Sequence, residues 1–143
     1  MRYKPHEYQK YAIEFIKKNP IAAILLDMGM GKTSIVLSAL NELMYDSFEV
    51  TKVLIIAPLR VARNTWSDEI KKWDHLNGIR YSIAVGAAEE RMTALKADAD
   101  IYIINRENVR LRDIHELLDM FDIREVAVFR HVDRRMRPVP GVV

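Results

Sequence analysis

The residues of this sequence that could do chemistry are gathered in one short stretch, LLDMGMGKTS, at positions 25–34. Gly29 and Gly31 allow the backbone to curl and to approach a phosphate without a Cβ in the way. The free N–H groups and the dipole at the start of a helix attract the same anion. Lys32 can reach the β- and γ-phosphates of a nucleotide, and the Thr33 hydroxyl can ligate Mg²⁺.

The stretch therefore predicts a phosphate-binding loop. Lys32 and Thr33 are its catalytic candidates, and its nucleotide-binding candidates are Met28, Gly29, Met30, Gly31, Lys32, Thr33 and Ser34. The usual pattern begins with a glycine five residues before the Gly-Lys pair, and Leu26 stands there instead. The alternative is a chance Gly-x-Gly-Lys-Thr at a helix start, but the apolar run before the stretch and the helical pattern after it favour the phosphate loop.

The elements that must position this loop follow from the hydrophobic pattern. Four apolar runs read as buried strands: IAAILL (21–26), KVLIIAP (52–58), RYSIAV (80–85) and DIYIIN (100–105). Helical patterns cover 6–18, where Asn19-Pro20 ends the helix, then 32–44, a segment through Trp73, 88–97 and 111–121. Strands that are apolar on both faces, each followed by a helix, predict an α/β domain of three layers around a parallel sheet.

Two of these pieces together resemble one family. LLDMGMGKT is similar to the DEMGLGKT type of phosphate loop in Swi/Snf-type superfamily II helicases and DNA translocases, which also lacks the leading glycine. PHEYQKYAIEFI, at 5–16, resembles the family's adenine-recognition element, in which a Tyr-Gln pair opens an amphipathic helix. The resemblance implies an N-terminal RecA-like lobe with ATP and Mg²⁺ as cofactors, Mg²⁺ on Thr33 and adenine read by Gln9. Taken alone, Gln9 would be an exposed helix residue.

Two further stretches resemble family elements that contact DNA. In VLIIAPLRVARNTWSDEIKKW, at 53–73, a strand ends in Ala-Pro-Leu and a helix ending in Trp follows, which implies backbone contacts from Arg60, Arg63 and Asn64. IYIINRENV, at 101–109, is an inexact match to a second strand-contact loop and implies Asn105 and Arg106. A solvated turn is the alternative for the arginines. The expected partners are double-stranded DNA, held by its backbone, and a second RecA-like lobe that lies outside this sequence.

The acidic half of the catalytic site is expected to be missing. ATP hydrolysis needs an acidic residue to hold Mg²⁺ and another to orient the attacking water. The family supplies both as Asp-Glu at the end of a buried strand, but here VAVF (126–129) is short, and Asp133 is followed by two arginines. We therefore expect a partial helicase ATP-binding domain at 1–125, ending at or before that motif, and a chain that binds ATP weakly and hydrolyses little.

The segment at 126–143 is interpreted as a tail outside the family, translated out of frame. When reading resumes at the second base of the Val126 codon, the codons permit Trp-Pro-Phe-Phe-Asp-Met-Leu-Ile-Asp-Glu, which would restore the missing strand and its acidic pair. Codon degeneracy leaves coincidence as the alternative, and the nucleotide sequence of the gene decides between them. The tail is expected to be poorly ordered or to pack without family-like geometry.

Composition narrows the remaining classes. A chain of 143 residues, half of them apolar, fits one domain with a buried core, and its net charge of +2 is compatible with a nucleic-acid partner. The absence of cysteine excludes disulfides and thiolate metal sites, and the four histidines have no metal-ligand spacing. No apolar run approaches membrane-spanning length, so we expect a cytoplasmic protein of bacterial or phage origin without a membrane partner.

Two other functions stay open on the sequence. One is a nucleotide-binding or regulatory module without turnover, which the missing Asp-Glu strand favours for the chain as given. The other is a small P-loop kinase, although no arginine-rich lid follows the third strand and the Tyr-Gln element would have no role in it. ATPase activity measured with and without DNA distinguishes the three.

Overall fold

The structure, a computed structural model, describes residues 1–109 and 126–128. The helix expected at 111–121 lies outside the described residues. The elements follow in the order α1 (Glu7–Lys18), α2 (Lys32–Tyr45), β1 (Val53–Ala57), η1 (Val61–Thr65), α3 (Trp66–Lys72), η2 (Asp74–Leu76), β2 (Tyr81–Ala84), α4 (Ala88–Lys96), β3 (Ile101–Asn105), η3 (Arg106–Asn108) and β4 (Val126–Val128).

The four strands form one parallel sheet in the order β2-β3-β1-β4. β1 and β3 pair along their whole length, from Val53 opposite Ile101 to Ala57 opposite Asn105. Because parallel strands run the same way, the residues that precede them share one edge of the sheet, the amino edge. The loops that follow Ala57 and Asn105 share the opposite, carboxyl edge.

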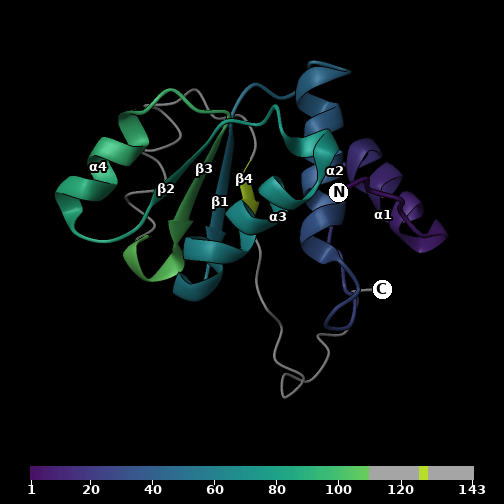
Figure 1. Cartoon of the computed structure of the whole chain (residues 1–143), viewed down its shortest axis with the longest axis horizontal. Helices are drawn as coiled ribbons and strands as arrows, with labels where there is room; N and C mark the ends of the chain where they lie inside the picture. The colour runs from purple at the N-terminus through teal and green to yellow at the C-terminus, as the bar shows by residue number, and fades with distance from the viewer. Residues whose placement is uncertain (110–125, 129–143) are drawn as a thin grey trace.

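Helices cover both faces of the sheet, as the alternation of strand side chains requires. Ile55 and Ile103 belong to the core beneath α2 and α3. Leu54 and Tyr102 point to the other face, where Leu95 of α4 packs. Figure 1 shows α1 and α2 on the right of the sheet and α4 on its left. The predicted three-layer α/β arrangement is confirmed.

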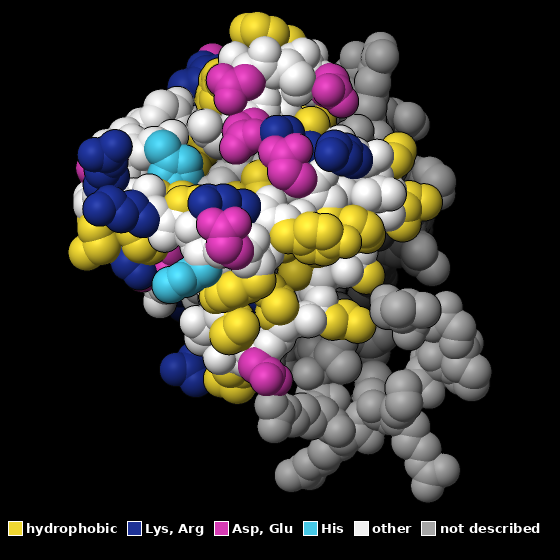
Figure 2. Space-filling view, turned by 90° about the vertical axis from the view of Figure 1, so that its right-hand side faces the viewer, with side chains coloured by type: hydrophobic (Ala, Val, Ile, Leu, Met, Phe, Trp, Pro, Cys, Tyr) yellow, Lys and Arg dark blue, Asp and Glu magenta, His cyan; other side chains and the backbone are white. Residues whose placement is uncertain are grey.

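α1 forms where the pattern predicted it and ends before Asn19, but its buried side is narrow. The buried residues are Gln9, Ala12 and Ile13, which pack toward α2. Tyr11, by contrast, is 74% exposed. Figure 2 looks onto the α1 side of the molecule, where hydrophobic side chains lie between groups of charged ones. The helical spacing was therefore predicted correctly, but it does not distinguish the buried apolar residues from the exposed ones.

The strand predicted at 21–26 is wrong. That segment has no strand structure, and Ile21 and Leu25 are 95% and 63% exposed. A strand exists only where its backbone groups pair with a neighbour, and none of the four described strands pairs with these residues. Only Ile24 and Leu26 pack against a core, the small one between α1 and α2.

A strand forms instead at the start of the expected tail. β4 lies beside β1 in parallel register, with Leu54 opposite Val126 and Ile56 opposite Val128. The sheet therefore extends past position 125, where the family-like domain was expected to stop. The interpretation of 126–143 as an out-of-frame segment stays a prediction.

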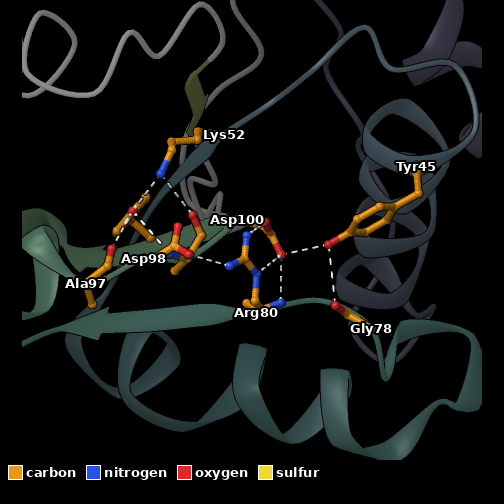
Figure 3. Close-up of polar contacts among 9 residues, drawn as sticks. Tyr45, Lys52, Gly78, Arg80, Ala97, Asp98 and Asp100 are labelled. Carbon is orange, nitrogen blue, oxygen red and sulfur yellow. Dashed lines mark hydrogen bonds and ion pairs between the residues drawn. The ribbon is translucent and has the colours of Figure 1, made fainter.

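A polar network joins three elements at the amino edge (Figure 3). We call Tyr45, Arg80, Asp98 and Asp100 the amino-edge clamp. The Asp100 carboxylate accepts hydrogen bonds from the Arg80 backbone N–H (2.9 Å), from Arg80 Nη2 (2.8 Å) and from the Tyr45 hydroxyl (2.7 Å). Arg80 Nη1 also reaches Asp98 at 2.6 Å. Because Tyr45 ends α2 while Arg80 and Asp100 precede β2 and β3, the clamp fixes the helix against both strands.

The hydrogen bonds of the clamp also shift the pKa values of Asp100 and Tyr45. Burial alone raises the pKa of Asp100, which is 9% exposed, but the hydrogen bonds from Arg80 and Tyr45 outweigh it and hold this pKa below its usual value. Burial and the hydrogen bond to Asp100 raise the pKa of Tyr45 to about 12. At neutral pH the carboxylate is therefore charged and the phenol is a donor.

Candidate functional site

A cavity of about 650 Å³ opens beside the sequence stretch that was singled out first. We call residues 27–33 the glycine loop. The cavity is lined by three groups of residues: Gly29, Gly31, Lys32 and Thr33 of the glycine loop and the start of α2; Tyr3, Lys4, His6, Tyr8 and Gln9 of the N-terminal segment and α1; and Pro58, Thr65, Trp66, Glu69, Lys72 and Trp73 after β1. All of the predicted nucleotide-binding residues except Met30 thus line one cavity.

The two glycines of the loop adopt a backbone conformation that other residues rarely take. Gly29 and Gly31 have φ angles of +80° and +75°. At Gly31 a Cβ would also lie 2.6 Å from Gln9 Nε2 and 3.0 Å from Ser34 Oγ, whereas at Gly29 it would meet nothing within 4 Å. The positive φ therefore favours glycine at both positions, and at Gly31 a Cβ would also displace the ends of the Gln9 and Ser34 side chains.

Lys32 begins α2, and its side chain folds back over the loop. Its ammonium donates to the carbonyls of Leu26 and Asp27, at 2.8 Å each. Thr33 follows in the first turn of the helix and lines the cavity. A cation at the edge of a loop that starts a helix fits an anionic ligand, since the ammonium can exchange carbonyl oxygens for phosphate oxygens.

Ser34 and the two methionines of the stretch meet the loop in different ways. Ser34 is buried, and its hydroxyl donates to the Gly31 carbonyl at 2.9 Å. Met30 offers its carbonyl to α1, whereas Met28 is 82% exposed. Ser34 therefore supports the loop from inside, and the exposed Met28 is among the residues that line the cavity.

Gln9 connects the start of α1 to the glycine loop. Its Oε1 accepts the His6 backbone N–H at 2.9 Å, and its Nε2 donates to the Met30 carbonyl at 3.3 Å. The Tyr8 hydroxyl donates to the same carbonyl at 3.1 Å. Gln9 is 7% exposed, so its alternative reading as an exposed helix residue is wrong. Its role in reading adenine stays a prediction.

The residues expected to contact DNA after β1 lie on an irregular helical turn. Arg60, Arg63 and Asn64 are all exposed. The turn from Val61 to Thr65 is π-helical, a form that occurs often at functional sites. Only Ala62 of this turn is buried, so the turn is held from one side and its polar side chains point to solvent.

The residues expected to contact DNA after β3 differ from each other. Asn105 is buried, and its amide donates to Glu107 Oε2 (3.1 Å) and accepts from Asn108 Nδ2 (2.6 Å). Arg106 is exposed. Because Asn105 lies opposite Ala57 in the sheet register, both loops leave the same edge from neighbouring positions. Asn105 therefore holds the turn through its two side-chain hydrogen bonds, and Arg106 lies exposed on that turn.

Residues 1–109 contain no group of three or more His, Asp or Glu side chains that could hold a metal ion. The Thr33 hydroxyl stays the predicted protein ligand of Mg²⁺. No helix within the same residues is long and apolar enough to cross a membrane.

Sequence reasoning missed the far wall of the cavity. Tyr3 forms a T-shaped pair with Trp73, with ring centroids 5.0 Å apart. Glu69 accepts from the Trp73 indole at 2.6 Å. Residues some seventy positions apart come together here, and no local periodicity reports such a contact. The sequence pattern identified Trp73 only as the end of a helix.

Comparisons with known proteins agree with this architecture. The SNF2-related domain family matches residues 8–131. A relative described as "Putative protein p41", from Acyrthosiphon pisum secondary endosymbiont phage 1, is 37% identical over 108 residues. That alignment covers 75% of this chain and 24% of the relative, so the chain spans about a quarter of the relative's length.

The family match begins at Tyr8 in α1. It takes in the glycine loop, every described strand, and the loops that follow β1 and β3. Swi/Snf-type enzymes of this family are helicases and translocases that use ATP with Mg²⁺ and act on DNA. The parallel sheet with helices on both faces is the architecture of their RecA-like lobe. The chain belongs to the SNF2-related domain family, as an N-terminal Swi/Snf-type helicase lobe.

Proposed function

We propose that this chain is an ATP-binding lobe whose glycine loop holds the nucleotide phosphates, and that the complete enzyme couples ATP hydrolysis to movement on DNA. The observation that carries the proposal is the arrangement around Gly31. This residue caps the start of α2 at positive φ, lies close to the side chains of Gln9 and Ser34, and borders a cavity large enough for a nucleotide.

The residues of the chain divide the work of binding. The backbone N–H groups at the start of α2 face the phosphates, and the Lys32 ammonium leaves the Leu26 and Asp27 carbonyls to neutralise phosphate charge. The Thr33 hydroxyl would hold Mg²⁺, which when bound polarises the phosphates for attack. Gln9 already touches the loop through Met30 and would exchange that bond for the adenine edge.

The carboxyl edge supplies the proposed contacts to DNA. Arg60, Arg63 and Asn64 are exposed on one turn, and Arg106 is exposed on the next. Exposed guanidinium groups on neighbouring turns suit the phosphates of a DNA backbone, which carry no sequence information. Asn105 contributes by holding the second turn.

Nucleotide binding by a matched pair of variants tests the proposal. Lys32→Ala should abolish detectable ATP binding in calorimetry, because it removes the ammonium that lies over the loop carbonyls. Lys18→Ala, a change of the same kind at an exposed α1 residue, should leave binding as in the unchanged chain. Equal ATP affinity of the two variants would contradict the phosphate-loop assignment.

Catalytic measurements separate the complete enzyme from the chain alone. The chain should show little ATP turnover with or without DNA, because its sequence has no Asp-Glu pair at the end of a buried strand. In a full-length relative, DNA should stimulate turnover, and alanine at both positions equivalent to Arg60 and Arg63 should weaken that stimulation and its salt dependence. Turnover that needed a small acceptor instead of DNA would support a kinase.

A further inference from the structure

The Met30 carbonyl joins the glycine loop to α1. It accepts hydrogen bonds from two successive residues of that helix, from the Tyr8 hydroxyl at 3.1 Å and from Gln9 Nε2 at 3.3 Å. A carbonyl oxygen has two lone pairs and can therefore hold both donors at once. Both of these side chains line the nucleotide cavity. One acceptor in the loop is thus shared by a tyrosine and a glutamine that border the proposed nucleotide site.

The direction of this carbonyl also sets the direction of a backbone donor. The peptide bond between Met30 and Gly31 is planar and trans, so the Met30 C=O and the Gly31 N–H point to opposite sides of the chain. Hydrogen bonds that hold the carbonyl toward α1 therefore hold this N–H away from α1. Because Gly31 caps the start of α2, its N–H belongs to the donors that a phosphate can use there. The two bonds to Met30 thus orient part of the proposed phosphate site.

The two donors differ in what each can do when a nucleotide binds. Under the proposed function, Gln9 leaves the carbonyl for the adenine edge, so Met30 loses that bond. The phenol of Tyr8 has a single hydrogen, which the same carbonyl accepts. The Tyr8 ring is held beside it by stacking on His6, with ring centroids 5.8 Å apart and planes at 6°. Tyr8 is therefore suited to supply the bond that remains.

We propose that Tyr8 is a positioning residue that keeps the glycine loop bonded to α1 when Gln9 turns to the base. The inference rests on the proposed nucleotide binding and extends it to the hydroxyl of Tyr8. With this hydroxyl in place, the Met30 carbonyl keeps a donor whether the cavity is empty, holds phosphates alone or holds a nucleotide. Without the hydroxyl, recognition of the base would leave the carbonyl with neither donor, and the loop would lose its attachment to α1.

The role predicts a loss of affinity that depends on the base of the ligand. Tyr8→Phe keeps the ring and its stacking partner and removes one hydrogen bond. It should raise the dissociation constant of ATP about five-fold relative to that of inorganic tripolyphosphate, as for a hydrogen bond of ordinary strength. Tripolyphosphate has no base, so Gln9 stays on the carbonyl when this ligand binds.

The same substitution in a Gln9→Ala chain isolates the cause. No donor is then withdrawn by the base, so Tyr8→Phe should leave the ratio of the ATP and tripolyphosphate dissociation constants as it is in Gln9→Ala alone. If Gln9→Ala does not fold, Gln9→Glu takes its place, because the carboxylate can still accept the His6 N–H but cannot donate to Met30. Tyr11→Phe, at an exposed tyrosine of the same helix, is the matched control and should leave the ratio unchanged.

Titrations of the whole chain with each ligand and Mg²⁺, followed by NMR, measure these constants. An unchanged ratio in Tyr8→Phe would mean that the hydroxyl has only a structural role, and a ratio raised equally with and without Gln9 would mean that Tyr8 contacts the base itself. Either result overturns the positioning role and leaves the proposed function intact. Failure of the unchanged chain to bind either ligand overturns the proposed function, and this role with it.

The exchange made by Gln9 can also be followed in the unchanged chain, which keeps the test open if Tyr8→Phe does not fold. The side-chain amide resonances of Gln9 should move further with ATP than with tripolyphosphate, because only ATP takes the Nε2 donor from the Met30 carbonyl. Equal movement with the two ligands would show that Gln9 does not leave the carbonyl for the base, and it would overturn the role given to Tyr8.

Discussion

At the amino edge of the sheet, the Asp100 carboxylate is enclosed by donors from Arg80 and Tyr45, whereas at the carboxyl edge Arg60, Arg63 and Arg106 are exposed to solvent. Between the edges runs α2, whose last residue belongs to the amino-edge clamp and whose first residue is Lys32. At 1.5 Å per residue, its 14 residues span about 21 Å. One helix therefore has a rigidly bonded end and an end that can exchange its partners.

This difference between the two ends of α2 predicts whether a substitution changes mainly the stability of the fold or also the binding of a ligand. A polar group satisfied inside the protein resists removal, because its partners would be left buried without bonds. A loop that closes on a ligand must instead give up weak internal contacts, as the Lys32 ammonium can with two carbonyls. Substitutions at the amino edge should therefore lower the free energy of unfolding, and those at the glycine loop should also lower the affinity for a ligand.

The largest expected effect is that of Asp100→Ala. It removes the acceptor of three hydrogen bonds from Arg80 and Tyr45, and because these donors are partly exposed we expect it to lower the free energy of unfolding by about 2–3 kcal/mol. Urea denaturation followed by circular dichroism measures the change. The matched control is Asp98→Ala, which removes an exposed partner of the same arginine and should cost about 0.5 kcal/mol. Similar costs for the two variants would mean that the clamp gains nothing from burial.

The second effect, at Gly31, should fall on stability and on affinity together. Gly31→Ala places a methyl group at φ +75° against Gln9 and Ser34, which should cost about 1–2 kcal/mol of stability and weaken ATP binding by distorting the loop. Gly29→Ala has the same backbone strain in open space and should cost less, and Gly78→Ala, with ordinary φ and open space, should cost almost nothing. Denaturation and calorimetry on the three variants check this order. A larger cost at Gly29 than at Gly31 would contradict the close packing of the loop.

Much of this organisation was accessible from the sequence because it is local. The helix starting at Lys32, the strands after Lys52, Arg80 and Asp100, and the glycine pair all follow from short-range patterns. The family resemblance placed Lys32 and Thr33 in one element and Gln9 in another, and the structure brings all three residues to one cavity.

The failures share one physical cause, which is dependence on distant partners. The run at 21–26 is as apolar as a buried strand, but a strand needs a neighbour to pair with, and no described strand takes that place. The bond from Tyr45 to Asp100 and the contact of Tyr3 with Trp73 link residues far apart in the chain. Neither contact produces a periodic pattern within a short stretch of sequence, so local sequence patterns cannot predict it.

A smaller effect tests how the clamp reaches α2. Tyr45→Phe keeps the ring and removes one donor to Asp100, so we expect a loss of about 1 kcal/mol in the free energy of unfolding. Combined with Asp100→Ala it should add little, since the acceptor is already gone. Full additivity in this double-mutant cycle, measured by denaturation, would show that the hydroxyl contributes through other contacts.

The smallest effect concerns His75, whose ring stacks on Tyr3 and bonds to Ser38 of α2. Protonation of His75 should loosen the wall of the cavity, and it should leave the amino-edge clamp unchanged. Burial lowers the pKa of His75 despite the nearby charges of Glu42 and Asp74, so the folded chain favours the neutral ring. The stability gained from this is complete above the unfolded-state pKa of about 6.5 and is lost as pH falls through the lower folded value. The pKa of Asp100 is also lowered, and its contribution is lost only once pH falls below the unfolded-state value of about 3.9. Urea midpoints measured between pH 7.5 and 5 should therefore decline in the unchanged chain and decline less in His75→Gln. In Asp100→Asn the urea midpoints should decline with falling pH as they do in the unchanged chain. A decline that disappeared in Asp100→Asn would instead assign the pH dependence to the amino edge.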